Sequence, residues 1–172
     1  DVDQLSALHR RIAEAMKKRY GADTAHASSL AYHWGEAGDL PKEGYYAGLA
    51  GEYALQNGAY QESVVFLEKA LNQDVTLTPD PEQRKHLPRA ERERALGQAY
   101  YGLGNLGKAR EHGSQALLYL GRKLPEGRGG VSALIRAFAR QSAHRIGVIP
   151  KVLGEVRPIH EAVRVYGLIG EI

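Results

Sequence analysis

"YYGLGNLGKAREHG" (residues 100–113) is compatible with two very different folds. Gly102, Gly104 and Gly107 spell G-x-G-x-x-G, a dinucleotide-binding spacing, and with Lys108 they match G-x-x-x-x-G-K, a phosphate loop that lacks its final Ser or Thr. Such loops follow a buried strand, so that the amides of the next helix converge on phosphate. Here a charged, helix-forming segment comes first. We therefore predict that this segment is a turn between helices and that the chain neither binds nor hydrolyses ATP.

The same kind of turn recurs along the chain, which favours a repeated helix hairpin over a unique catalytic loop. The copies are "AGDLPKE" (37–43), "NGAYQES" (57–63) and "LGNLGKA" (103–109). In each copy the glycine is expected to end a helix in the left-handed backbone conformation, which glycine adopts without steric strain because it has no Cβ. A small residue lies seven positions before each of these glycines, where the two helices of a hairpin can approach closely. These small residues are Ala31, Gly51 and Gly97.

Apolar residues recur at helical spacing almost throughout, and no segment alternates like a strand. Glycine and proline divide the chain into eight expected helices. Their ranges are 5–20, 24–37, 41–57, 60–73, 82–103, 106–122, 131–147 and 158–170. Loops are predicted at 73–83 and 123–130, and the fifth helix is predicted to bend or restart near Pro88. The predicted fold class is all-α, an array of antiparallel helix hairpins.

The composition is that of a globular protein of ordinary domain size. The 172 residues are 43% hydrophobic and 25% charged, and no apolar run is long enough for a membrane span. The lack of cysteine excludes disulfides and thiolate chemistry and fits the cytoplasm. Because the sequence starts at Asp1 without a methionine, we expect residues 1–172 to be a single domain of a larger multidomain protein.

The positive charge is concentrated in the C-terminal third. Residues 122–172 hold nine Lys or Arg against four Asp or Glu. Nucleic-acid binding through Arg136, Arg140 and Arg145 is therefore an alternative, disfavoured because the charges are spread along a helical pattern. A small-ligand sensor is a third possibility.

No residue pattern indicates catalysis, a cofactor or a metal. His26 and His33 would share a helix face two turns apart, without the one-turn spacing of H-E-x-x-H sites. Glu91 and Glu93 lie two positions apart on a helix and point to different sides, so they form no acid–base pair. The sequence predicts a protein that is not an enzyme.

The packing motifs resemble the tetratricopeptide repeat, best over 93–117 and well over 47–71. Taken in order, six segments are similar to the helical-repeat region that follows the nucleotide-binding module in bacterial STAND-type signal-transduction ATPases, including those fused to adenylate or guanylate cyclase domains. The segments are "LHRRIAEAM" (8–16), "LAYHWGEAGDLPKE" (30–43), "AGEYALQNGAYQESVVFLEKAL" (50–71), "LGQAYYGLGNLGKAREH" (96–112), "YLGRKLP" (119–125) and "EAVRVYGLIGEI" (161–172). The resemblance implies a non-enzymatic interaction or sensor module, since the ATPase and cyclase chemistry of that family lies in other domains.

The resemblance also implies where a partner would bind. In tetratricopeptide arrays the first helix of each hairpin lines a concave face, and we take helices 41–57 and 82–103 as first helices. The inward positions are then Gly48, Glu52, Leu55, Gln56, Arg94, Gln98, Tyr101 and Gly102, and the six that are not glycine are the expected partner-binding residues. We expect a protein or peptide partner there, with Arg94 binding a carboxylate. The alternatives are a groove filled by the chain's own C-terminal helix or a neighbouring domain, or a helix pairing shifted by one.

The C-terminal segment from Pro158 carries one apolar helical stripe. Its members are Ile159, Ala162, Val163, Tyr166 and Ile169. Repeat arrays need a polar cap at their ends. We therefore expect this helix to pack back on the array, to pair with a second copy, or to be disordered.

Overall fold

The described part of the protein is entirely helical. The computed structural model describes residues 2–21, 23–77, 86–122, 156–170 and 172, and within these ranges no residue lies in a strand. The elements, in chain order, are α1 (Val2–Tyr20), the short 3-10 helix η1 (Thr24–His26), α2 (Ala27–Glu36), α3 (Leu40–Gln56), α4 (Tyr60–Leu77), α5 (His86–Gly102), α6 (Leu106–Tyr119) and α8 (Val156–Gly170). The prediction of an all-α fold is confirmed for these residues.

One of the predicted boundaries was wrong. Helix α4 continues to Leu77, so residues 73–77 are helical and do not begin a loop. Helix α5 begins at His86, which places Pro88 in its first turn and agrees with the predicted restart near this proline. Proline is tolerated in a first turn because its missing N–H has no partner there. The predicted helix 131–147 and loop 123–130 lie outside the described residues.

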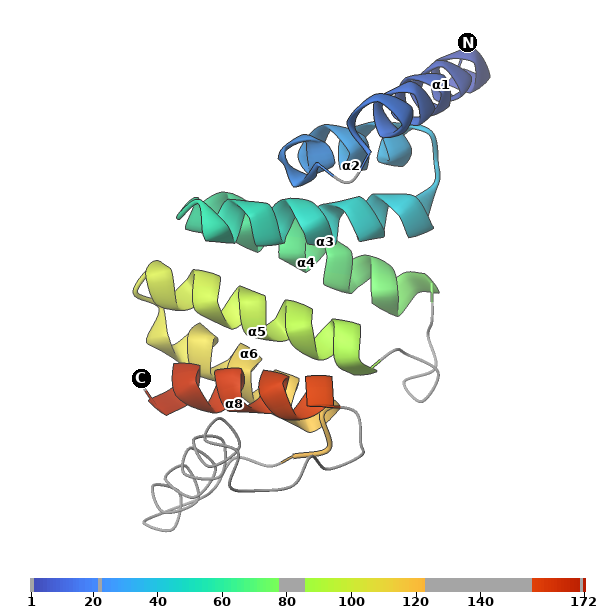
Figure 1. The fold of residues 1–172 in the computed structure, drawn as a ribbon. Helices are drawn as coiled ribbons and strands as arrows, with labels where there is room; N and C mark the ends of the chain where they lie inside the picture. The colour runs from blue at the N-terminus through green and yellow to red at the C-terminus, as the bar shows by residue number, and fades with distance from the viewer. Residues whose placement is uncertain (1, 22, 78–85, 123–155, 171) are drawn as a thin grey trace.

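Each helix packs against the next one along the chain, and the helices stack in sequence order from α1 to α8 (Figure 1). Helix α3 also contacts α5 directly. Helix α8 follows α6 in the stack and contacts both α6 and α5. The C-terminal helix therefore packs back on the preceding helices, the first of the three expected arrangements.

The recurring glycine turns have the expected geometry. After α3, the N–H of Gly58 donates to the Leu55 carbonyl at 3.1 Å and that of Ala59 to the Ala54 carbonyl at 2.9 Å. This pair of bonds closes a helix whose next residue is left-handed. The φ angles are 71° at Gly38, 73° at Gly58 and 75° at Gly104. Gly21 and Gly121 also have positive φ and follow α1 and α6, which adds two turns that the sequence analysis did not include.

The small residues before these turns lie where two helices approach closely, as predicted. A Cβ added at Gly51 would lie 2.6 Å from Leu67 of α4, and one at Gly97 would lie 3.1 Å from the Ala109 carbonyl of α6. The Gly51 carbonyl also accepts a 2.8 Å hydrogen bond from the buried Ser63 hydroxyl. An added Cβ would therefore clash at Gly51, whereas at Gly97 the neighbouring atoms would have to move by a few tenths of an ångström.

The core runs along the stack in three clusters. The first surrounds Trp34, between α1, α2, α3 and α4, and the second joins α4 to α5 and α6 through Leu67 and Leu96. The third holds α8 on α6. The buried apolar residues of α8 are Ala162, Val165 and Leu168. The predicted stripe was therefore too narrow, because α8 touches two helices and buries a wider face.

Candidate functional site

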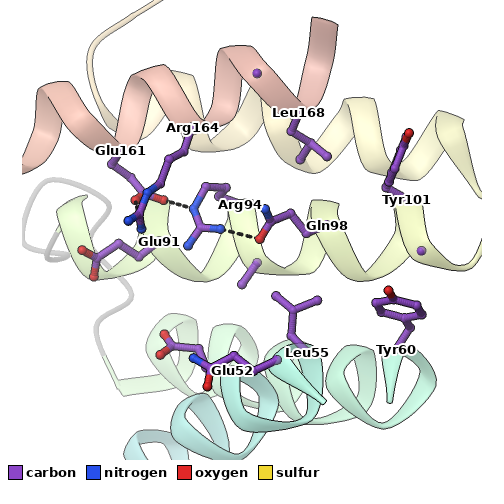
Figure 2. Close-up of a pocket in the computed structure, with 14 residues that line it drawn as sticks. Glu52, Leu55, Tyr60, Glu91, Arg94, Gln98, Tyr101, Glu161, Arg164 and Leu168 are labelled. Atoms are coloured by element: carbon purple, nitrogen blue, oxygen red, sulfur yellow. Dashed lines mark hydrogen bonds and ion pairs between the residues drawn. The ribbon is translucent and has the colours of Figure 1, made fainter. Parts of the chain in front are cut away.

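Seven of the eight residues predicted to face inward, including all six expected partner-binding residues, line one open groove of about 770 Å³ between α3, α5 and α8. The eighth, Gly48, lies against the Arg92 side chain and outside the groove. On α3, Glu52, Leu55 and Gln56 lie three and four positions apart and so share one helix face. The remaining three partner-binding residues face the same space from α5, as Figure 2 shows for Arg94, Gln98 and Tyr101. These residues of α3 and α5 therefore face one common space.

One end of the groove is apolar and aromatic. Leu55, Tyr101 and Leu168 of α8 lie there with Tyr60, the first residue of α4 (Figure 2). The Tyr60 ring lies against Gly102, where an added Cβ would be 2.6 Å from the ring. This end therefore offers apolar surface to a bound group, and the missing side chain at Gly102 makes room for the ring.

The other end of the groove is charged, and its main cation is already occupied. The Arg94 guanidinium donates from Nε to the Glu161 carboxylate of α8 and from its NH1 group to the Gln98 side-chain carbonyl. The exposed fractions of the Arg94 and Glu161 side chains are only 14% and 4%. The carboxylate that Arg94 was expected to bind is thus supplied by the chain itself.

Glu52 is the groove carboxylate with the least compensation. It is half-buried on α3, and within the described part of the chain the structure gives it no hydrogen-bond or ion-pair partner. Burial is the main cause that raises its pKa, and the charge of Glu91 raises it further. The positive charges of Arg94 and Arg92 lower the pKa of Glu52 and partly offset these two effects.

Sequence reasoning missed the contribution of α8 to this site. Helix α8 supplies Glu161, Arg164 and Leu168, and so forms a third wall of the groove and does not fill it. The signal that could have located α8 is Gly113, a glycine inside α6. A Cβ there would lie 2.9 Å from Ile169, so this glycine is where α8 approaches α6.

The glycine-rich segment at 100–113 serves packing and turn formation. Gly104 ends α5, and the next helix begins where the Asn105 side chain accepts a hydrogen bond from the Lys108 N–H at 3.1 Å. The Lys108 ammonium lies over the Tyr100 ring, 4.6 Å from its centre, and donates to the Tyr100 hydroxyl at 3.0 Å. The Tyr100 hydroxyl in turn donates to Glu68 at 2.7 Å. The lysine is thus part of a contact between helices.

The prediction that His26 and His33 share a face of one helix is wrong. His26 belongs to η1 and stacks on Tyr20, with ring centres 3.8 Å apart. His33 instead faces His9 of α1, and their Nδ1 atoms are 3.0 Å apart. Burial lowers the pKa of His33, and the charge of His9 lowers it further. In the described ranges, no three His, Cys, Asp or Glu side chains lie close enough to hold a metal ion together.

Glu91 and Glu93 point to different sides of α5, as predicted. Glu91 lines the groove, whereas Glu93 is buried and lies 2.9 Å from His112. The basic residues of the nucleic-acid alternative, Arg136, Arg140 and Arg145, lie outside the described residues. None of the described helices has the length and apolarity needed to cross a lipid bilayer.

Comparison of the chain with protein-family models, with curated proteins and with solved structures finds no match in any of the three.

Proposed function

We propose that this chain is a non-enzymatic protein-interaction module whose groove between α3, α5 and α8 binds an extended peptide. The observation that carries the proposal is that the six expected partner-binding residues share one open groove with both apolar and polar walls. The Gln56 and Gln98 side chains line it, and amides can hydrogen-bond a peptide backbone. The apolar end offers a place for one anchoring side chain.

The wider setting of the proposal comes from the sequence. The tetratricopeptide-like spacing of small residues and turn glycines favours an irregular α-solenoid, and such arrays bind partners on their concave side. The resemblance to the repeat region of STAND-type ATPases places the module in a larger cytoplasmic signalling protein. The bound peptide then comes from a partner protein or from a neighbouring domain of the same chain.

A small-molecule sensor is the second candidate, favoured by the size of the groove. Ligand sites commonly measure about 300–1,000 Å³, and the groove volume of about 770 Å³ falls within that range. Both candidates use the same residues, so they differ in the ligand and not in the site.

A display selection tests the proposal. The 172-residue chain is immobilised and screened against a library of random 12-residue peptides, and the enriched peptides are then measured against two variants. We expect Tyr101→Ala to bind them at least tenfold more weakly. Tyr45→Ala removes an exposed tyrosine of α3 that does not line the groove and should bind like the wild type. The proposal is wrong if no peptide is enriched or if Tyr101→Ala binds normally.

A further inference from the structure

We propose that the peptide taken by this groove is basic, with a Lys or Arg side chain beside Glu52 and an apolar side chain between Leu55, Tyr60 and Tyr101. This inference rests on the proposed function and adds the chemistry of the partner. It reverses the expectation from the sequence, which placed a partner's carboxylate on Arg94.

The first step is that the charge of Arg94 is already matched inside the groove wall. Its Nε donates to Glu161 and its NH1 group donates to Gln98, and both contacts lie within the wall. Glu161 is buried, so an incoming carboxylate would have to compete with it for the same guanidinium. Arg164, the other groove cation, reaches the same carboxylate at 4.0 Å.

The second step is the charge that remains. The groove is lined by three glutamates, Glu52, Glu91 and Glu161, and by two arginines, Arg94 and Arg164. Both arginines are directed to Glu161, as Figure 2 shows. The groove therefore has one more carboxylate than guanidinium group, and Glu52 is the carboxylate of its α3 wall.

The nearest cation outside the groove does not compensate Glu52 either. Arg92 acts on Glu52 electrostatically, but its guanidinium forms a 2.6 Å ion pair with Asp74 of α4. A half-buried carboxylate with no ion pair of its own is best complemented by a cation that arrives with the partner. Lys and Arg provide that cation on a long apolar stem that can lie along the groove.

The third step is the distance between the charged and the apolar ends. Arg94 and Tyr101 mark these ends on α5 and are seven residues apart, which is about 10 Å along a helix axis. An extended peptide covers about 3.3 Å per residue. The basic and the apolar side chains of the partner should therefore be two to four positions apart.

The test uses the random 12-residue library on the wild-type chain and on Glu52→Lys. We expect wild-type selections to enrich peptides with Lys or Arg two to four positions from an apolar residue, and selections on Glu52→Lys to lose that preference. For a synthetic peptide from the wild-type selection, Glu52→Gln should weaken binding about tenfold. Replacing the basic residue of that peptide by norleucine should abolish the difference between the two proteins. Glu62→Gln, an exposed glutamate of α4 outside the groove, is the matched control.

The outcomes separate this inference from the proposed function. Enriched peptides that depend on Tyr101 but are acidic or show no charge preference would overturn the basic partner and leave the peptide groove standing. A selection without any peptide that depends on Tyr101 would overturn both. Equal binding of the basic peptide to the wild type and to Glu52→Gln would place the cation elsewhere and contradict the inference.

Discussion

Arg94 of α5 and Glu161 of α8 form an ion pair between residues 67 positions apart in the sequence. Both side chains are largely shielded from solvent within the groove wall. The pair therefore fixes the third wall of the groove, which means that Arg94 builds the site and is not a free recognition group. A substitution at Arg94 therefore tests the stability of the fold and not partner binding alone.

Replacing Arg94 by alanine should destabilise the chain. The change leaves the buried Glu161 carboxylate without its main partner, and loss of one member of a buried ion pair costs about 3 kcal/mol or more. Urea unfolding followed by circular dichroism measures the effect. The double replacement Arg94→Met with Glu161→Leu should recover most of the loss, and Tyr101→Ala should lower the melting temperature by no more than a few degrees. An unchanged urea midpoint for Arg94→Ala would show that the ion pair of Arg94 with Glu161 does not stabilise the fold.

The features that sequence predicted are those that depend on local chemistry. Gly58 and Gly104 end helices because no side chain opposes a positive φ, and the helical period alone places Glu52, Leu55 and Gln56 on one face. By the same logic Leu40, Tyr60 and Leu106, which follow the turn glycines, are equivalent positions.

These three positions are nevertheless not equivalent in space. Tyr60 lies on Gly102 in the next hairpin, whereas Leu40 is 37% exposed and Leu106 is 45% exposed. The contacts of Glu161 with Arg94 likewise join distant parts of the chain, which no periodicity encodes. Sequence therefore identified the groove residues of α3 and α5 but not the wall contributed by α8.

The unpaired Glu52 should contribute less to the stability of the fold at neutral pH than in acid. Its pKa is raised in the folded chain, so the folded state favours the neutral carboxyl and loses stability as pH rises from about 4.3, the ordinary glutamate value, through the raised pKa. Glu52→Gln should then raise the unfolding free energy at pH 7 relative to the wild type. The gain should vanish near pH 4. Glu62→Gln is the control, and a destabilised Glu52→Gln at pH 7 would contradict the raised pKa.

The His9 and His33 pair should make the contact between α1 and α2 sensitive to acid. The pKa of His33 is lowered in the folded chain, so the unfolded chain takes up a proton first and stability falls as pH drops below about 6.5. We expect the melting temperature to fall between pH 7.5 and pH 5, and to fall less for His9→Gln. His160→Gln, an exposed histidine of α8, should keep the wild-type slope. A His9→Gln variant with the full slope would rule out the pair as its source.

The chain should show no saturable binding of Mg-ATP by calorimetry. Lys108 donates a hydrogen bond to the Tyr100 hydroxyl. Gly104 adopts a positive φ at the end of α5, and Gly102 leaves room for the Tyr60 ring. Replacing Lys108 by methionine should leave the melting temperature nearly unchanged, since the contact is at the surface. Saturable heat that disappears in this variant would support a phosphate loop instead.

Two glycine replacements should change stability in opposite directions. Gly51→Ala places a Cβ 2.6 Å from Leu67 Cγ and 3.1 Å from the Leu67 backbone nitrogen, so α3 and α4 must separate, which costs about 1–3 kcal/mol. Gly167→Ala on α8 meets nothing within 4 Å, and alanine is favoured over glycine in a helix by about 1 kcal/mol. Thermal unfolding of the two variants measures the difference. A neutral Gly51→Ala would mean that the two helices cross with more space than the structure gives them.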